Sequence, residues 1–255
     1  MWQRIVRRWS LAESGAAHIR PPVAAGQHWI RGALARPNNL RYASVLPAGI
    51  VRCKSTTDAA QAILWSREFN VPLIARSGGH SYAGYSTTTG LMLDLSLMNR
   101  TSFDPSTGIV TVGGGVVNRD LYRALKEANV TITHGRCPSV GGAAFVLGGG
   151  VGFNMRRYGL ACDQMLKTTL VDADGNVLTA TPGENADLFW ACRGAGGGNL
   201  GINTSLSLQT FPVQDLTVFR LAWNSNPQDL YAALVDALAA APATLGSRLA
   251  LDAVT

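Results

Sequence analysis

The chain has 255 residues, of which 47% are hydrophobic and 15% are charged, and its formal net charge is +6. A globular chain of this length buries about 70–75% of its unfolded surface, which is enough for one large domain or one and a half. Positive charge is typical of nucleic-acid-binding proteins. Here, however, the basic residues neither form runs nor alternate with aromatic residues, so no nucleic-acid partner is expected.

The cysteines and the apolar runs argue against further classes. Cys53, Cys137, Cys162 and Cys192 are far apart, with no C-x-x-C pair and no histidine–cysteine cluster, so neither a disulfide framework nor a metal site is expected. Every apolar run is too short to span a membrane, so no membrane association is expected.

Residues 1–37 are weakly patterned and form an expected N-terminal extension. Arg4, Arg7 and Arg8 are similar to the positive region of an export signal, but prolines and charged residues interrupt what would be its apolar region. We therefore expect a cytoplasmic protein by default, and a secreted one if an export signal was lost.

From residue 38 to residue 213 the pattern is α+β. Short apolar or alternating runs predict strands at 48–53, 71–75, 91–95, 109–112, 166–172, 177–181 and 201–211. Apolar residues at helical spacing predict helices at 57–69 and 119–128, with Thr57 and Asn118 as N-caps. Asp174-Gly175 predicts a hairpin. The domain is expected to end near Pro212, and a helix at 227–240 begins another.

The predicted strand at 71–75 leads into a loop with the sequence R-S-G-G-H-S at 76–81. Gly78 and Gly79 allow the backbone to approach a ligand closely, because no Cβ stands in the way. Successive N–H groups in such a turn form an anion-binding concavity, and Arg76 adds a positive charge. Taken alone, the stretch fits an ordinary tight turn with a surface histidine equally well.

A second stretch, at 135–152, has seven glycines in eighteen residues. Because each glycine loses extra backbone entropy on ordering, we expect neither a helix nor a strand here, and expect the segment to be held by a ligand with phosphates or a flat ring. Cys137 lies in this segment beside an arginine, where thiolate character is favoured. Cys53 and Cys192 lie in apolar settings and are expected in the core.

Six motifs in order give the chain a resemblance to a known family. They are R-S-G-G-H-S (76–81), G-R-C-P-S-V-G (135–141), L-G-G-G-V-G (147–152), R-Y-G-L-A-C-D (157–163), N-A-D-L-F-W-A-C-R-G (185–194) and G-G-G-N-L-G-I (196–202). Across residues 38–213 the chain resembles the berberine-bridge-enzyme-like branch of the vanillyl-alcohol-oxidase flavoproteins. It departs from the family at Ala143-Ala144, where glycine is more common, and this change narrows the space against a cofactor.

The resemblance implies a PCMH-type FAD-binding domain of two α/β subdomains at 38–213, followed by the beginning of an incomplete substrate-binding domain at 214–255. It also implies that His80 is tethered to the 8α-methyl carbon of FAD and Cys137 to ring carbon C6; the alternative is that Cys137 only packs. The other implied cofactor contacts are Arg76, Ser77, Gly78, Gly79, Ser81, Ser139, Val140, Gly141, Gly142, Gly148, Gly149, Gly150, Gly152, Tyr158, Gly159, Asp163, Asn199, Gly201 and Ile202.

Several residues in or near these motifs have plainer interpretations. Tyr158 and Trp190 are expected in the core rather than on a ligand. Asp163 fits the role of a turn cap equally well. His134, His28 and His18 match no family role and are expected at the surface or with satisfied hydrogen bonds.

The activity implied by the resemblance is FAD-dependent oxidation of a small molecule, namely an alcohol, a sugar or a secondary metabolite. Hydride passes to the flavin and O2 is the acceptor. Family enzymes draw their catalytic base from a C-terminal half that is not recognised in these 255 residues, so no base is named and the oxidase site is expected to be incomplete.

Three alternatives compete with this interpretation, and two of them remain open. The first is a flavin-binding remnant without turnover, and the second is a non-covalent reductase of the same fold. The third is a nicotinamide-binding Rossmann domain, because Gly113-Gly114-Gly115 lies between a predicted strand and a predicted helix. We discount the third because the spacing is not G-x-G-x-x-G.

Overall fold

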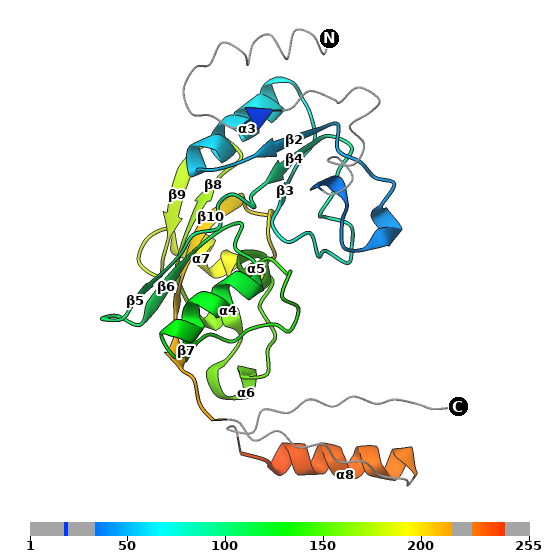
Figure 1. Cartoon of the computed structure of the whole chain (residues 1–255), viewed down its shortest axis with the longest axis vertical. Coiled ribbons are helices and arrows are strands. Elements are labelled where there is room, and N and C mark those ends of the chain that lie inside the picture. The colour runs from blue at the N-terminus through cyan, green and yellow to red at the C-terminus, as the bar shows by residue number, and fades with distance from the viewer. Residues whose placement is uncertain (1–17, 20–33, 216–225, 243–255) are drawn as a thin grey trace.

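A computed structural model describes residues 18–19, 34–215 and 226–242. Its N-terminal part is a four-stranded sheet with the order β1-β2-β4-β3 (Figure 1). The strands are β1 (His18–Ile19), β2 (Gly49–Arg52), β3 (Leu73–Arg76) and β4 (Leu91–Asp94). β2, β4 and β3 are parallel, whereas β1 is antiparallel to β2. The mixed sheet with its crossover helix makes this part an α/β unit.

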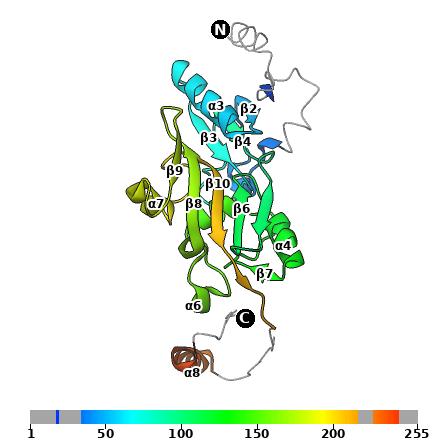
Figure 2. The ribbon, with the colours of Figure 1, turned by 90° about the vertical axis from the view of Figure 1, so that its left-hand side faces the viewer.

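The second sheet is antiparallel and has the order β5-β6-β10-β8-β9 (Figure 2). Its strands are β5 (Thr101–Asp104), β6 (Ile109–Gly113), β8 (Met165–Val171), β9 (Val177–Ala180) and β10 (Ile202–Gln209). The hairpin predicted at Asp174-Gly175 joins β8 to β9, and Gly175 has the positive φ that such a turn requires. The long central strand β10 pairs with both β6 and β8.

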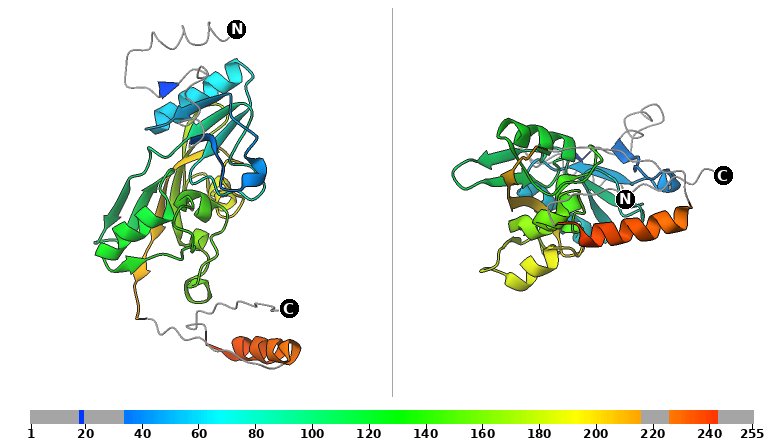
Figure 3. Two further views of the ribbon diagram at one scale, coloured as in Figure 1. Left: turned by 45° about the vertical axis from the view of Figure 1, so that its right-hand side comes forward. Right: turned by 90° about the horizontal axis from the view of Figure 1, so that it is seen from below.

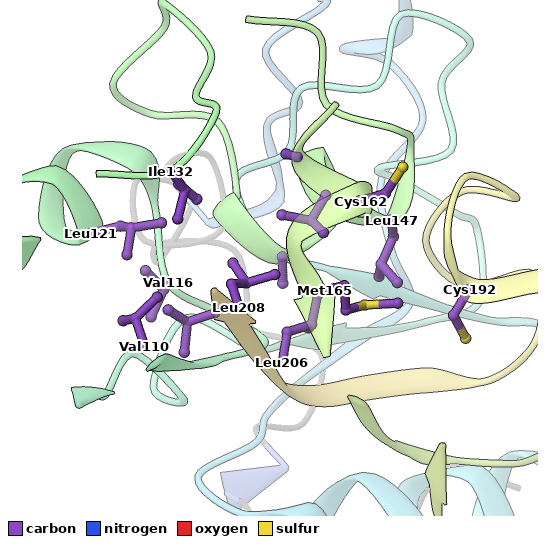
Figure 4. Packing of buried hydrophobic residues seen from close by; sticks show 14 of the residues in the cluster. Val110, Val116, Leu121, Ile132, Leu147, Cys162, Met165, Cys192, Leu206 and Leu208 are labelled. Atoms are coloured by element: carbon purple, nitrogen blue, oxygen red, sulfur yellow. The ribbon is translucent and has the colours of Figure 1, made fainter. Parts of the chain in front are cut away.

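Helices cover one face of this second sheet and enclose the larger core. They are α4 (Asn118–Glu127), α5 (Gly142–Leu147) and α7 (Ala186–Cys192). Leu121 from α4, Leu147 from α5 and Cys192 from α7 pack with Leu206 and Leu208 of β10 (Figure 4). Short elements complete this part: η1 (Leu40–Tyr42), α6 (Met155–Tyr158), η2 (Ala161–Gln164) and the pair β7 (Val130–Thr131) with β11 (Phe211–Pro212).

A smaller core lies under α3 (Thr56–Glu68), which packs on the parallel sheet. Ile63 and Trp65 of α3 are buried in the same cluster as Val51 of β2 and Leu93 of β4. Val171 at the end of β8 also belongs to it, so the cluster joins the two sheets. Cys53 lies in this cluster, and Cys162 and Cys192 lie in the larger one; the predicted core positions of Cys53 and Cys192 are confirmed.

Several predicted details are wrong. Ser55, not Thr57, caps α3: its hydroxyl accepts from the Asp58 N–H, and the Asp58 carboxylate accepts from the Ser55 N–H. Strand β5 was not expected, because only two of its four residues are turned inward. The expectation that 135–152 contains no helix fails for α5, since between Gly142 and Gly148 its five residues A-A-F-V-L are all non-glycine.

The helix predicted at 227–240 is present as α8 (Pro227–Ala240), with Asn226 as its N-cap. It lies apart from both sheets (Figures 1 and 3). The Arg156 guanidinium donates to the carbonyl oxygens of Leu238 (2.9 Å) and Ala241 (2.9 Å). None of the helices in the described ranges is long and apolar enough to cross a membrane. The domain boundaries at residues 37 and 213 stay predictions.

Candidate functional site

Two loops from different halves of the fold meet in direct contact. One follows β3 and carries residues 77–81, and the other precedes α5 and carries residues 137–141. A Cβ on Gly78 would lie 2.3 Å from the Ser139 carbonyl oxygen and 2.4 Å from the Gly141 nitrogen. Conversely, a Cβ on Gly141 would lie 2.3 Å from the Ser77 hydroxyl oxygen. Both positions therefore require glycine, and this is why two separate glycine motifs occur in the sequence.

The contact brings together the two side chains predicted to hold a cofactor. The Nε2 atom of His80 lies 2.9 Å from the hydroxyl oxygen of Ser139, and the Cys137 sulfur lies 3.8 Å from the same oxygen. The distance between the Nε2 atom of His80 and the sulfur of Cys137 therefore cannot exceed the sum of these two distances. His80 is partly buried and Cys137 is exposed, so both remain accessible to a ligand.

The first loop holds several polar groups in a partly buried setting. Burial lowers the pKa of His80, so its imidazole is neutral at pH 7. The Ser77 hydroxyl oxygen is buried and has no hydrogen-bond partner among the described residues. Gly79 has a φ of +74°, and the Arg76 guanidinium lies directly beneath it. That guanidinium donates to the Arg36 carbonyl oxygen (2.6 Å), so it braces the loop from below.

The second loop is fixed by the first turn of α4. The Asn118 N–H donates to the Val140 carbonyl (2.9 Å), and the Arg119 N–H donates to the Pro138 carbonyl (2.9 Å). The Asn118 side chain, which is 1% exposed, donates to the Cys137 carbonyl (3.1 Å). Asn118 was predicted to be the N-cap. Val117 takes that position instead, and Asn118 anchors the loop as the first helical residue.

The glycines at 148–152 pack mainly against protein. A Cβ on Gly150 would lie 2.4 Å from the Ala161 side chain, and one on Gly152 would lie 2.5 Å from the His134 carbonyl. Gly149 and Gly150 both have positive φ, and their carbonyls accept from Cys162 and Ala161. Packing against η2 and His134 therefore accounts for Gly150 and Gly152 without a ligand, and the predicted contact of the glycines at 148–152 with the flavin stays a prediction.

The motifs at 157–163 and 185–194 are joined by an ion pair that the sequence did not reveal. The Arg193 guanidinium donates to the Asp163 carboxylate (3.0 Å) and to the Cys162 carbonyl (2.8 Å). The other Asp163 oxygen accepts from the Leu160 N–H (2.9 Å), which confirms the alternative that Asp163 caps a turn. Gly159, with positive φ, packs against that carboxylate.

The aromatic predictions have mixed outcomes. Tyr158 is partly buried and stacks on Phe211, with ring centroids 3.6 Å apart. Trp190 is 77% exposed, so its predicted core position is wrong: it lies on the face of α7 opposite to Phe189 and Cys192. His134 contacts the Gly135 carbonyl and the Tyr122 ring, as expected of a satisfied histidine. The side chains of His18 and His28 lie outside the described part of the chain.

The predicted cofactor contacts Asn199, Gly201 and Ile202 lie in different surroundings. The Asn199 amide donates to the Ala195 carbonyl (2.5 Å) within an exposed, glycine-rich segment. Gly201 has a φ of +136° and leaves no room for a Cβ beside the Val171 carbonyl. The Ile202 side chain is 5% exposed and belongs to the smaller core, so packing accounts for it.

The three glycines at 113–115 do not form a dinucleotide loop. The Gly114 N–H donates to the Thr204 carbonyl (2.8 Å), and the Gly115 N–H donates to the Met98 carbonyl (3.1 Å). Because these donors are used within the protein, they are not free to bind a phosphate, and the Rossmann alternative is set aside.

Comparison with known proteins identifies the family. Residues 47–181, which are more than half of the chain, match the family model described as FAD binding domain. The chain belongs to the berberine-bridge-enzyme-like, PCMH-type family of FAD-linked oxidoreductases. Among its curated relatives, (R)-6-hydroxynicotine oxidase of Paenarthrobacter nicotinovorans is 37% identical over 198 residues, which are 75% of this chain and 43% of the relative.

Solved structures of berberine-bridge-like proteins share the fold. The BBE-like 1 protein of Physcomitrella patens superposes with a TM-score of 0.74 and 33% identity, over 81% of this chain and 44% of that one. Glucooligosaccharide oxidase from Acremonium strictum, described with a 6-S-cysteinyl, 8α-N1-histidyl FAD, gives a TM-score of 0.68 and 34% identity, over 77% of this chain and 41% of that one. The chain thus spans about two fifths of the length of these family members.

The residues where the two loops meet fit the cofactor of this family. A buried hydroxyl without a partner, at Ser77, is available for a polar group of the ligand. Cys137 is the one exposed cysteine of the four, all of which lie in the described ranges, and it is on the same side of the loop contact as His80. Sequence analysis did not identify Asn118 and Tyr122 as residues that anchor this loop. The Tyr122 hydroxyl donates to the Gly135 carbonyl (2.8 Å). Their position in the first two turns of a helix following a glycine cluster is the only sequence signal for this anchoring.

Proposed function

We propose that this chain is the flavin-binding part of an FAD-dependent oxidase that holds its cofactor covalently through His80 and Cys137. The observation that supports this most directly is the convergence of the two side chains on one hydroxyl, that of Ser139, from loops that are distant in the sequence. Two of the three relatives named above, the hydroxynicotine and glucooligosaccharide enzymes, are oxidases. The proposed substrate is an alcohol, a sugar or a secondary metabolite, with O2 as the electron acceptor.

The residues have distinct roles in this proposal. When bound, FAD supplies the acceptor for a hydride from the substrate. A neutral imidazole and a thiolate are both competent nucleophiles towards an electron-poor ring, and His80 is neutral because of its burial. Ser77 offers a hydroxyl to a polar group of the cofactor, and Gly78 and Gly141 permit the close approach of the two loops. No catalytic base is assigned to this chain.

The experiment that tests the proposal measures the intact mass and the visible absorbance of the purified protein after acid precipitation. We expect yellow colour in the pellet and a mass increase of one FAD per chain. A protein that binds FAD but releases it into the acid supernatant would instead be the non-covalent alternative. Colourless protein that cannot be reconstituted with FAD would contradict the proposal entirely. Bleaching of the bound flavin by a candidate sugar or alcohol separates a working oxidase from a binding remnant.

The burial of His80 also predicts how covalent attachment depends on pH. Because desolvation disfavours the imidazolium, the pKa of His80 lies below its ordinary value of 6.5. The nucleophilic, neutral form therefore predominates at pH 7 and is lost as the pH falls through this lowered pKa. We expect the rate of attachment to change little between pH 8 and pH 7 and to decline once the pH falls below the ordinary histidine value of 6.5.

This rate is measured best in the Cys137→Ala variant, in which only the histidine bond can form. Apoprotein is mixed with FAD at each pH, portions are quenched in acid, and flavin in the precipitate is quantified. An attachment rate that rises as the pH is lowered would contradict the assigned role of the neutral imidazole.

A further inference from the structure

We propose that the Ser139 hydroxyl is a positioning group for both attachment residues: it accepts from the Nε2–H of His80 and directs its own hydrogen to the Cys137 sulfur. This inference rests on the proposed function. It adds Ser139 as a residue that acts through His80 and Cys137 and so influences both proposed bonds to the cofactor.

The argument begins with the hydrogen-bond capacity of a hydroxyl, which has one hydrogen to donate and lone pairs with which to accept. The Ser139 oxygen lies 2.9 Å from His80 Nε2 and 3.8 Å from the Cys137 sulfur. With a single hydrogen, it can donate to only one of the two at a time. The hydrogen bonds along His80, Ser139 and Cys137 can therefore run in either of two directions, which we call the two polarities.

Only one polarity makes both residues reactive. When His80 Nε2–H donates to Ser139 and Ser139 donates to sulfur, Nδ1 carries a free lone pair and the sulfur is a thiolate. In the reverse polarity the Cys137 S–H donates to Ser139, Ser139 donates to Nε2, and the imidazole hydrogen is on Nδ1. The imidazole nitrogen left free of hydrogen is then occupied by Ser139, and the sulfur is a neutral thiol, which is a weak nucleophile.

The proposed attachment requires the first polarity. Ser139 occupies Nε2 in both polarities, so Nδ1 is the ring nitrogen left to react, and it is free of hydrogen only when Nε2 carries the hydrogen. Tyr122, whose hydroxyl donates to the Gly135 carbonyl, remains neutral because burial raises its pKa. His80 is neutral, so it carries one ring hydrogen, and the nitrogen nearest to Ser139 is Nε2.

Ser139 is also held in place, as a positioning role requires. The carbonyls of Cys137, Pro138 and Val140, which surround it in the chain, all accept hydrogen bonds from the first turn of α4. Its own carbonyl lies against Gly78, two residues before His80. The loop cannot shift along β3 without breaking these contacts, so the hydroxyl remains between the two reactive atoms.

The first test uses the wild-type apoprotein and needs no variant. In protein labelled with ¹⁵N-histidine, the ring nitrogen shifts of His80 report which nitrogen carries the hydrogen. We expect hydrogen on Nε2 and a bare Nδ1. A His80 ring with its hydrogen on Nδ1 would overturn the inference.

The second test measures how fast iodoacetamide alkylates Cys137 in the apoprotein at pH 7. We expect Ser139→Ala to slow this reaction about tenfold, because one hydrogen bond to a charged sulfur is lost, and Ser139→Thr to restore it. Cys53, Cys162 and Cys192 are buried and remain unmodified, so the site of reaction is defined. Ser106→Ala, which removes an exposed hydroxyl bonded only to Asp104, is the matched control and should leave the rate unchanged.

Both apoprotein measurements are independent of whether FAD becomes attached. If they succeed but the wild-type protein carries no covalent flavin, the proposed function fails while the role of Ser139 stands. If wild-type protein carries covalent flavin and Ser139→Ala alkylates and attaches FAD at the wild-type rate, the role of Ser139 fails while the proposed function stands. A Ser139→Thr variant that behaves like Ser139→Ala would also contradict it, since threonine keeps the hydroxyl.

Discussion

The double variant His80→Ala/Cys137→Ala is expected to release all of its flavin on acid precipitation, whereas the wild-type protein is expected to retain one FAD per chain. The reason is that these two side chains are the proposed nucleophiles and converge at the loop contact, and an alanine methyl group cannot bond to the ring. Each single variant keeps one bond and should therefore retain colour in the pellet. The measurement is absorbance of pellet and supernatant together with intact mass.

The spectra of the two single variants identify which bond remains in each. A sulfur on the flavin ring and a nitrogen on its methyl group perturb the chromophore differently, so the two denatured proteins should give different visible spectra. His134→Ala is the control, because the His134 ring lies beside the same loop and contacts the Gly135 carbonyl and the Tyr122 ring. Retention of flavin in the precipitated double variant would show that another residue makes the attachment.

Replacing Gly78 with alanine should both destabilise the protein and abolish FAD retention. The added Cβ would lie 2.3 Å from the Ser139 carbonyl oxygen and 2.4 Å from the Gly141 nitrogen, and these backbone atoms cannot rotate away as a side chain can. Forcing the loops apart should lower the free energy of unfolding by about 3 kcal/mol, which corresponds to a fall in Tm of about 6–12 °C. Calorimetry of the apoprotein and the flavin content after reconstitution measure the two effects.

Gly183→Ala is the matched control for this substitution. Gly183 has no atom within 4 Å of an added Cβ and does not have a positive φ, so alanine should be accommodated there with little change in Tm. A Gly78→Ala variant as stable as Gly183→Ala, with full flavin content, would show that the two loops are not in contact in the folded protein.

The local parts of the fold could be predicted from the sequence because their signals are local. Asp174-Gly175 indicates a hairpin by turn chemistry alone, and α8 has Asn226 and Pro227 at its start. Asn118 shows the limit of such signals. Its residue type favours a cap, but a contact with the Cys137 carbonyl, nineteen residues away, places it inside the helix. Strand β5 was missed for a similar reason, since its partner β6 rather than its own pattern defines it.

The candidate site was predictable in its residues but not in its geometry. The motifs around His80 and Cys137 identified the two residues through resemblance to a family. That both contact Ser139 depends on how the parallel sheet and the helical layer pack together, which no local pattern encodes. The glycines at 150 and 152 show another limit, because their spacing indicated a ligand but could not reveal that an added Cβ would also meet η2 and His134.

The two loops that meet at Gly78 and Gly141 belong to opposite halves of the fold, and this has a consequence for folding. With both bonds made, the flavin would act as a covalent staple between His80 and Cys137, closing a long loop of chain in the same way as a disulfide does. Restricting the unfolded chain in this way raises the free energy of unfolding by roughly 4 kcal/mol for a loop of this length. Both bonds can be present only after the two halves of the fold have docked. A chain that carries the doubly attached, yellow flavin would therefore be fully folded and would resist separation of the two halves.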